Sequence, residues 1–315
     1  MTSGFIARPH RPQEPTIAAS TFVERTSEAP SLHVRTRLRE LWTYREILLN
    51  LVRKELKVKY TASVLGALWS VLNPIVFLAV FSFVTKVLNN QIPDFPVFLL
   101  SGLLAWNLFN AGLLQGSRSV LDNANLVKKV AFPREILPLS VVGVALVDFV
   151  LQSAVLLVFM LAIGYGFHVA ALLLYPLSFV TLVVFTTAMT FWVSALNVRY
   201  RDVQHLIGLA LLVWFWMTPI VYPGGLVQDK LVKATAPWSP HLWTVYLLNP
   251  LTPIVSGFQR ALYATVSPSG IRVLPDVSVL WLAGVIAAVL VVTLLLLLYT
   301  WRLFFRLSGD FAEEL

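Results

Sequence analysis

Long apolar runs recur along the chain, and each is about as long as a helix that crosses a lipid bilayer. The hydrocarbon core is about 30 Å thick, so such a helix needs roughly 20 mostly apolar residues. Because a sheet edge cannot satisfy its backbone groups in lipid, we expect the runs to be helices. The pattern predicts an all-α integral membrane protein with six transmembrane helices, at about 64–88, 97–120, 136–163, 169–197, 203–221 and 277–300.

A further apolar block, at about 241–263, is interrupted in a way that the other runs are not. The interruptions are Asn249, Pro250, Pro253, Gln259 and Arg260. Irregular backbone at membrane depth is tolerated only where protein or a water-filled cavity surrounds it. We therefore expect a pair of short re-entrant or interfacial helices between spans five and six, buried against protein.

The segment 35–59 has the pattern of an amphipathic helix. Its apolar side carries Leu38, Leu41, Trp42, Leu48, Leu49, Val52 and Leu56, and its polar side carries Arg39, Thr43, Glu46, Asn50, Arg53, Lys54 and Lys57. A helix of this kind lies in the membrane interface; the alternative is a simple basic anchor. Residues 1–34 are rich in proline and polar residues and are expected to be a disordered cytoplasmic tail, and 307–315 a second cytoplasmic tail.

Composition agrees with the membrane assignment. Hydrophobic residues make up 57% of the 315 residues and charged residues 13%, and the mean hydropathy is +0.76. A soluble domain has about 25% charged residues, so this chain could not cover a water-facing surface. It contains no cysteine, which excludes disulfides, iron–sulfur clusters and thiol catalysis.

The positive charge follows the predicted topology. The net charge is +8, but no basic stripe interleaved with aromatic residues lies on a soluble module, so we expect no nucleic-acid partner. With six spans and both termini in the cytoplasm, most Lys and Arg residues lie on the inner side. The outer side keeps Lys86, Lys230, Lys233, Arg260 and Arg272.

Enzymatic chemistry has little support in the sequence. No glycine is followed by lysine, so the phosphate-binding loop of an ATPase is absent, and any ATP must be bound by another chain. The five histidines are scattered without metal-ligand spacing, and we expect neither catalytic nor metal-binding residues. Asp148 is the one acid well inside a span, either as a functional group or as the partner of a donor on another helix.

Aromatic and amide side chains share stripes on several spans. Trp69, Asn73 and Phe77 recur at intervals of four residues, which places them on one helix face. Amides face lipid only at a cost, so these stripes should face protein or a watery path, although an interfacial aromatic belt is the alternative. Rings beside amides suit sugars, so we expect a glycan path lined by Trp69, Asn73, Phe77, Phe81, Trp106, Asn107, Asn110, Trp214, Trp216 and Tyr222.

Span two also contains a pair of glycines, Gly112 and Gly116, four residues apart. Such a pair lets two helices approach closely and is used for dimerisation in some membrane proteins, but it is common by chance.

Several segments, in order, resemble one family. They are 53–60 (RKELKVKY), 65–69 (LGALW), 73–74 (NP), 124–130 (ANLVKKV), 132–138 (FPREILP), 198–203 (VRYRDV), 215–222 (FWMTPIVY) and 249–253 (NPLTP). Together the segments, which span about 38–306, resemble the polysaccharide and polyol-phosphate export permeases of the ABC-2 type, which serve O-antigen, capsule and teichoic acid. The long outer loop at 222–276 departs from the family pattern.

This resemblance implies a transport subunit of the bacterial cytoplasmic membrane, with an ABC-2 type transmembrane domain at 35–306. It implies a homodimer with two copies of a cytoplasmic ATPase chain that binds ATP and Mg, and a lipid-linked glycan as the substrate. The coupling helix that contacts the ATPase would carry Asn123, Asn125, Lys128, Lys129, Phe132, Arg134 and Glu135. The alternatives are an ABC-2 exporter of a small lipid or drug, a lipid-linked glycosyltransferase, or an ion-coupled secondary transporter.

Overall fold

The computed structural model describes residues 34–61, 68–87, 92–166, 169–232, 239–264 and 272–315, and this part of the chain is helical with no strand. The helices are α1 (Val34–Thr43), α2 (Arg45–Thr61), α3 (Leu68–Val87), α4 (Phe95–Asp122), α5 (Ala124–Lys129), α6 (Ile136–Ala162), α7 (Val169–Leu172), α8 (Leu174–Arg199), α9 (Val203–Met217), α10 (Gly224–Val232), α11 (Ser239–Leu247), α12 (Leu251–Leu262), α13 (Val279–Ser308) and α14 (Phe311–Glu314). The prediction of an all-α membrane protein is confirmed for these residues.

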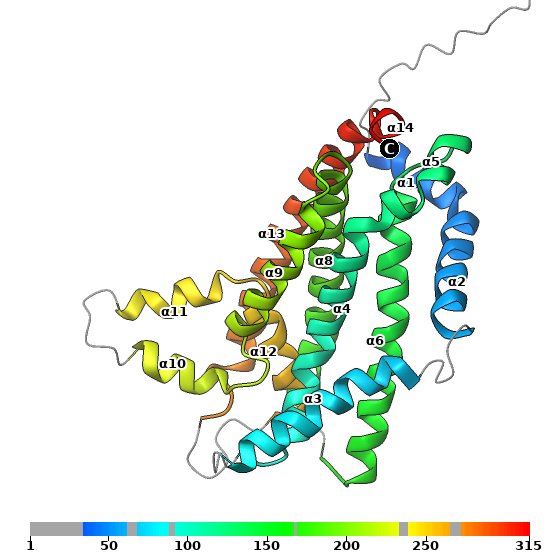
Figure 1. Cartoon of the computed structure of the whole chain (residues 1–315). Helices are drawn as coiled ribbons and strands as arrows, with labels where there is room; N and C mark the ends of the chain where they lie inside the picture. Colours follow the sequence, from blue (N-terminus) through cyan, green and yellow to red (C-terminus); the bar gives the residue numbers. More distant parts are fainter. Residues whose placement is uncertain (1–33, 62–67, 88–91, 167–168, 233–238, 265–271) are drawn as a thin grey trace, which may run out of the picture.

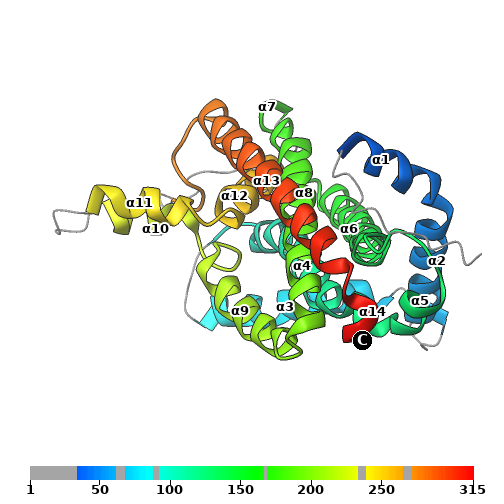
Figure 2. The same ribbon diagram turned by 90° about the horizontal axis from the view of Figure 1, so that it is seen from above.

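Within the described residues, four helical stretches are long and apolar enough to cross a membrane: α4, α6, α7 with α8, and α13. They form the body of the molecule, in which α8 packs along both α13 and α4, and α4 also packs along α6 (Figures 1 and 2). α4 is the most buried of the four. The core of the bundle therefore forms around α4 and α8.

The two glycines of α4 are used within this bundle. A Cβ atom on Gly112 would lie 2.4 Å from Cγ2 of Thr186, and one on Gly116 would lie 2.4 Å from Cγ2 of Thr190. The Thr190 hydroxyl also donates to the Gly112 carbonyl oxygen at 3.1 Å. The close approach that the pair permits is thus made to α8 of the same chain, and this face is not free for a second copy.

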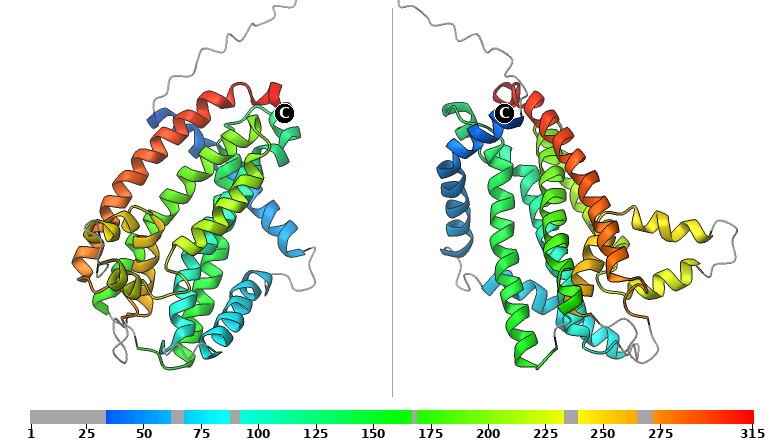
Figure 3. Two further views of the ribbon diagram at one scale, coloured as in Figure 1. Left: turned by 60° about the vertical axis from the view of Figure 1, so that its left-hand side comes forward. Right: turned by 180° about the vertical axis from the view of Figure 1, so that it is seen from behind.

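The first predicted span forms α3, a helix of 20 residues, and the fifth, α9, is shorter than expected at Val203–Met217. The 15 residues of α9 extend about 22 Å, less than the hydrocarbon core. α9 ends here because Thr218 precedes Pro219 and is extended, with φ −107° and ψ 137°. α3 runs obliquely across the far end of the bundle rather than along it (Figures 1 and 3).

The interrupted block breaks where the sequence predicts. α11 ends before Asn249 and α12 begins after Pro250. Every residue of α12 is buried except Arg260. α10 and α11, by contrast, form a pair that projects sideways from the bundle (Figures 1 and 3). Only α12 meets the expectation of burial against protein.

The amphipathic segment forms α1 and α2, and the two helices differ in what they contact. α2 runs beside the first half of α6, with Val52 against Gly143, so it packs on a long helix instead of lying flat across the bundle (Figure 1). In α1, Trp42 is 71% exposed and Leu38 54%, which leaves that apolar side open to lipid. The predicted disordered tail lies outside the described residues except for Val34.

Both described ends of the chain lie at the same end of the bundle. α1, α5 and α14 gather there, at the top of Figure 1. The residues expected as a C-terminal tail complete α13 and form α14, and Phe311 of α14 is buried. α3 and α12 lie toward the opposite end.

Candidate functional site

A groove of about 380 Å³ lies between α3, α4 and α9. It is lined by Phe77, Phe81, Trp106, Asn110, Leu114, Gly208, Leu211, Leu212, Phe215 and Trp216. Five of the residues that the sequence assigned to a glycan path are among them: Phe77, Phe81, Trp106, Asn110 and Trp216. The groove thus brings together side chains from three helices, and none of these ten residues is charged.

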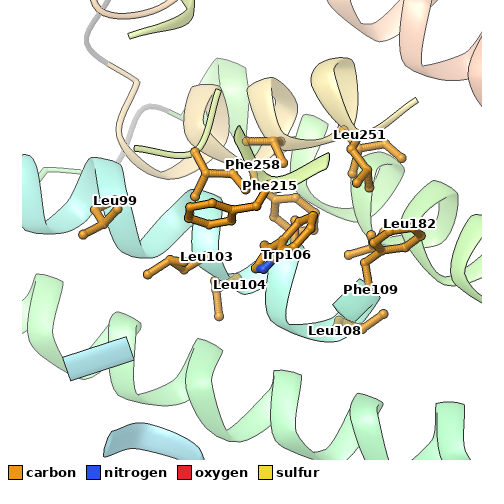
Figure 4. Close-up of a cluster of buried hydrophobic side chains, with 14 of the residues drawn as sticks. Leu99, Leu103, Leu104, Trp106, Leu108, Phe109, Leu182, Phe215, Leu251 and Phe258 are labelled. Atoms are coloured by element: carbon orange, nitrogen blue, oxygen red, sulfur yellow. The ribbon is translucent and has the colours of Figure 1, made fainter. Parts of the chain in front are cut away.

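Aromatic rings from the three helices interlock along this groove. Phe77 and Phe81 of α3 stack with their centroids 6.0 Å apart. Phe215 of α9 lies 6.0 Å from Phe77 and 5.2 Å from Trp106 of α4 (Figure 4 shows Trp106 and Phe215 together). Trp106 is 7% exposed, whereas Trp216 is 55% exposed. Trp106 is therefore largely a packing residue, and Trp216 offers its ring to the outside.

Phe215 is a central ring that the sequence prediction did not assign to the path. Helical spacing could have placed Phe215 on the groove. Gly208, Leu211 and Phe215 recur at intervals of three and four residues and so share one face of α9. The neighbouring Trp216 was assigned instead, and the structure brings both residues to the groove.

The amides of α4 divide between two faces. Asn110 lines the groove, but the Asn107 amide nitrogen donates to the Gln152 side-chain oxygen of α6 at 2.7 Å. Asn107 therefore contributes to the contact between α4 and α6. Trp69 and Asn73 belong to α3, but their side chains lie outside the described part of the structure.

Trp214 and Tyr222 belong to a separate polar cluster at the end of α9. The Trp214 ring nitrogen donates to the Asn249 side-chain oxygen at 2.8 Å, and the Asn249 amide donates to the Thr218 hydroxyl at 3.2 Å. The Tyr222 hydroxyl donates to the Trp216 carbonyl oxygen at 2.9 Å and lies 3.2 Å from the Tyr246 hydroxyl. These bonds fasten the end of α9 to α11 and to Asn249, which lies between α11 and α12, so Trp214 and Tyr222 position the segment that carries Trp216.

At the other end of the bundle, α5 carries part of the predicted coupling set on its surface. Asn125, Lys128 and Lys129 are exposed. The Asn123 amide donates to the Ser119 carbonyl oxygen at 2.9 Å, and its oxygen accepts from the Lys54 amine at 3.4 Å. Asn123 thus closes α4 and contacts α2.

The remaining coupling residues lie deeper. Phe132 is partly buried against an apolar cluster, and Glu135 is 2% exposed and accepts from the Trp301 ring nitrogen at 3.4 Å. Glu135 immediately precedes α6, which begins at Ile136, and a carboxylate at that position interacts favourably with the helix dipole. Burial lowers the pKa of the neighbouring Arg134 guanidinium, an effect that Glu135 opposes. Phe132, Arg134 and Glu135 therefore pack behind the exposed side chains of α5.

Asp148 has partners on another helix. Its carboxylate accepts from the Lys59 amine at 2.5 Å and from the Tyr60 hydroxyl at 2.5 Å, both of α2. The sequence left open whether Asp148 is a functional group or the partner of a donor on another helix. This geometry supports the second interpretation. Among the described residues, no group of three or more acidic or histidine side chains is arranged to hold a metal ion.

Comparison with a family profile and with individual known proteins points in each case to membrane transport proteins. The sequence profile of the family described as "ABC-2 type transporter" matches residues 47–263. The O-antigen export system permease protein RfbA of Myxococcus xanthus is 36% identical over 229 residues, which cover 72% of this chain and 84% of that protein. An RfbA of Klebsiella pneumoniae is 34% identical over 59% of this chain and 72% of that protein. The polysialic acid transport protein KpsM of Escherichia coli is 22% identical over 64% and 75%, respectively.

Proposed function

Because this chain belongs to the ABC-2 type transporter family, we propose that it is the membrane permease of an ATP-driven exporter that moves a lipid-linked polysaccharide or related polymer across the bacterial cytoplasmic membrane. The observation that carries the proposal is the 36% identity to an O-antigen export permease over 72% of the chain. The chain is the transport component, and a separate cytoplasmic ATPase chain binds ATP and Mg.

The distribution of charge supports an orientation with both termini in the cytoplasm. The end of the bundle that holds α1, α5 and α14 also receives the basic residues at the ends of α8 and α13, and cytoplasmic segments are enriched in Lys and Arg. The basic residues of α4, α5, the end of α8, the loop after it and the end of α13 include Arg118, Lys128, Lys129, Arg199, Arg201, Arg302 and Arg306. In this orientation α5 faces the ATPase.

A homodimer of six-span subunits would complete the transport path. In this proposal α3 and α9 serve as the first and fifth spans, and α11 and α12 as the re-entrant pair. α9 presents exposed apolar side chains in the groove, such as Leu212, and beside it, such as Leu209 and Val213. A second copy facing α3 and α9 would enclose the groove, which favours a path at the dimer centre worked by two ATPase chains.

The groove suits an uncharged part of a glycan. Aromatic rings stack on the C–H faces of sugars, and the Asn110 amide offers both a donor and an acceptor to hydroxyl groups. A charged lining would bind a polymer tightly at one place, whereas weak contacts repeated along the path let the polymer move on. Rigid-body motion of α5, driven by the ATPase, would be transmitted through α4 to the groove.

Replacing Trp216 with alanine is expected to slow polymer export about fivefold, because one aromatic contact is worth about 1 kcal/mol. The ring is 55% exposed in the single chain, so folding of the subunit should be unaffected. The matched control is Trp192→Ala in α8, where the ring is 40% exposed and does not line the groove. Export would be measured as labelled polymer delivered across the membrane of cells or vesicles. Equal rates for the two variants would contradict the aromatic path.

The two-chain arrangement predicts that the purified permease does not hydrolyse ATP, whereas its complex with the ATPase does. The reason is that the chain has no Gly-Lys pair from which a phosphate-binding loop could be built. Phosphate release measured with and without the partner chain tests this. Rapid hydrolysis by the isolated permease would contradict it, and a complex that exports a small lipid but no polymer would contradict the substrate class.

A further inference from the structure

We propose that the C-terminal residues 309–315 hold α5 in place, and that α5 and α14 together form the docking surface for the ATPase chain. The second half of this inference rests on the proposed function; the first half concerns this chain alone. The sequence predicts these residues to be only a cytoplasmic tail, and the packing assigns them a different role.

α5 cannot keep its position by itself. It has six residues, and a helix of that length is not stable in water without tertiary contacts. Its one fully buried side chain is Val127, which is 6% exposed. The orientation of α5 therefore depends on the residues that pack around Val127.

The C-terminal segment supplies part of that packing. α14 contacts α5, and Phe311 is 1% exposed in the same apolar cluster as Val127. The Phe311 ring meets Phe304 of α13 edge-on, with centroids 5.4 Å apart, and Phe304 in turn lies 5.4 Å from Phe191 of α8. The rings of Phe191, Phe304 and Phe311 thus form a row that connects α8 and α13 to α14, the helix that contacts α5.

The turn that brings α14 back to α5 is well bonded. The backbone amide of Asp310 donates to the Leu307 carbonyl oxygen at 3.2 Å, and that of Leu315 donates to Phe311 at 3.2 Å. The preceding turns of α13 hold two more segments of this end: Arg37 of α1 lies 3.9 Å over the Phe305 ring, and Trp301 donates to Glu135. The end of α13 is therefore the point at which α1, α5, α6 and α14 meet.

The surface that α5 and α14 share fits a protein better than it fits lipid. On α5, Lys128 and Lys129 are exposed, and Val130 is 47% exposed just after it. Asp310, just before α14, and Glu314, within it, are exposed. Anionic lipid would attract the two lysines but repel the two acids. A folded partner can match both signs of charge around an apolar centre, and the partner implied at this end is the ATPase.

A labelling experiment tests the first half without any measurement of activity. The natural chain has no cysteine, so Lys128→Cys provides a single site for a spin label. We expect Phe311→Ala to raise the mobility of this label severalfold in the full-length detergent-purified permease, and Phe311→Leu to restore most of the immobilisation. The matched control is Phe98→Ala, which removes an equally buried ring from a different cluster. It should lower thermal stability similarly without mobilising the label.

The second half is tested by charge reversal. The double change Asp310→Lys and Glu314→Lys should leave the mobility of the label at position 128 unchanged and weaken binding of the purified ATPase about five- to tenfold, since exposed interface charges contribute modestly. Unchanged mobility in Phe311→Ala would overturn the positioning role. Unchanged ATPase binding in the charge-reversed variant would overturn the shared surface. Failure of the proposed function has a different signature, namely that the wild-type permease binds no ATPase at all.

Discussion

Leucine in place of Gly112 is expected to prevent the helical bundle from forming. The first carbon of any side chain there would lie 2.4 Å from Cγ2 of Thr186, and leucine adds three more carbons in the same direction. α4 and α8 would have to separate, breaking the hydrogen bond from Thr190 to the Gly112 carbonyl oxygen. Overpacking costs about 1–3 kcal/mol and more where backbones must move. We expect the variant to be recovered mostly as aggregate in fluorescence-detected size-exclusion chromatography.

Gly284→Leu in α13 is the matched control for this change. No atom lies within 4 Å of the position that its Cβ would occupy, and the residue is exposed. Leucine is also a better helix former than glycine, by about 0.8 kcal/mol, so the control should be at least as stable as the wild type. A Gly112→Leu chain that folds normally but no longer dimerises would show that the glycine pair serves a contact between copies instead.

Loss of the Lys59 charge is expected to be the second large effect. Lys59→Met leaves the Asp148 carboxylate, whose side chain is 10% exposed, without the amine that lies 2.5 Å from it. Removing one member of a buried pair costs roughly 3–5 kcal/mol. Because the Lys59 side chain is 33% exposed, we expect a smaller cost of about 2 kcal/mol, measured as a fall in the thermal unfolding temperature.

A double-mutant cycle separates this ion pair from other effects. The double variant Lys59→Met and Asp148→Leu should recover much of the lost stability, because neither charge then remains buried without the other. Lys54→Met is the control, since the exposed Lys54 amine pairs with Glu55 of the same helix at 3.1 Å and with the Asn123 side-chain oxygen at 3.4 Å, and loss of these exposed contacts should cost less than about 1 kcal/mol. Export retained by the double variant would agree with a structural carboxylate. Export abolished despite restored stability would instead favour an ion-coupled role for Asp148.

The candidate groove could be predicted only in part. The sequence identifies aromatic and amide residues of the right chemistry, and five of them line one groove. It did not separate Asn107 from Asn110, although the two point to different neighbours of α4. Helical spacing tells which side chains share a face, but it does not tell which helix covers that face. The same reason explains why Phe215 was not assigned.

Buried charge was equally difficult to place. Asp148 is conspicuous in an apolar run, but its partners Lys59 and Tyr60 are almost 90 residues earlier in the chain. Glu135 is one of several charged residues in a polar segment, yet it is almost completely buried beside Trp301. A contact between residues so far apart leaves no local pattern in the sequence.

The sequence by itself determined the class of protein, the long apolar helices and the break at Asn249 and Pro250. These properties follow from local composition, because lipid demands long apolar helices and proline interrupts them. The tertiary structure decided that Gly112 and Gly116 face α8, that α2 is bound to α6 and that Phe311 packs beneath α5. Each of these depends on which surfaces meet, and that is settled by shape and by the pairing of buried polar groups across the whole chain.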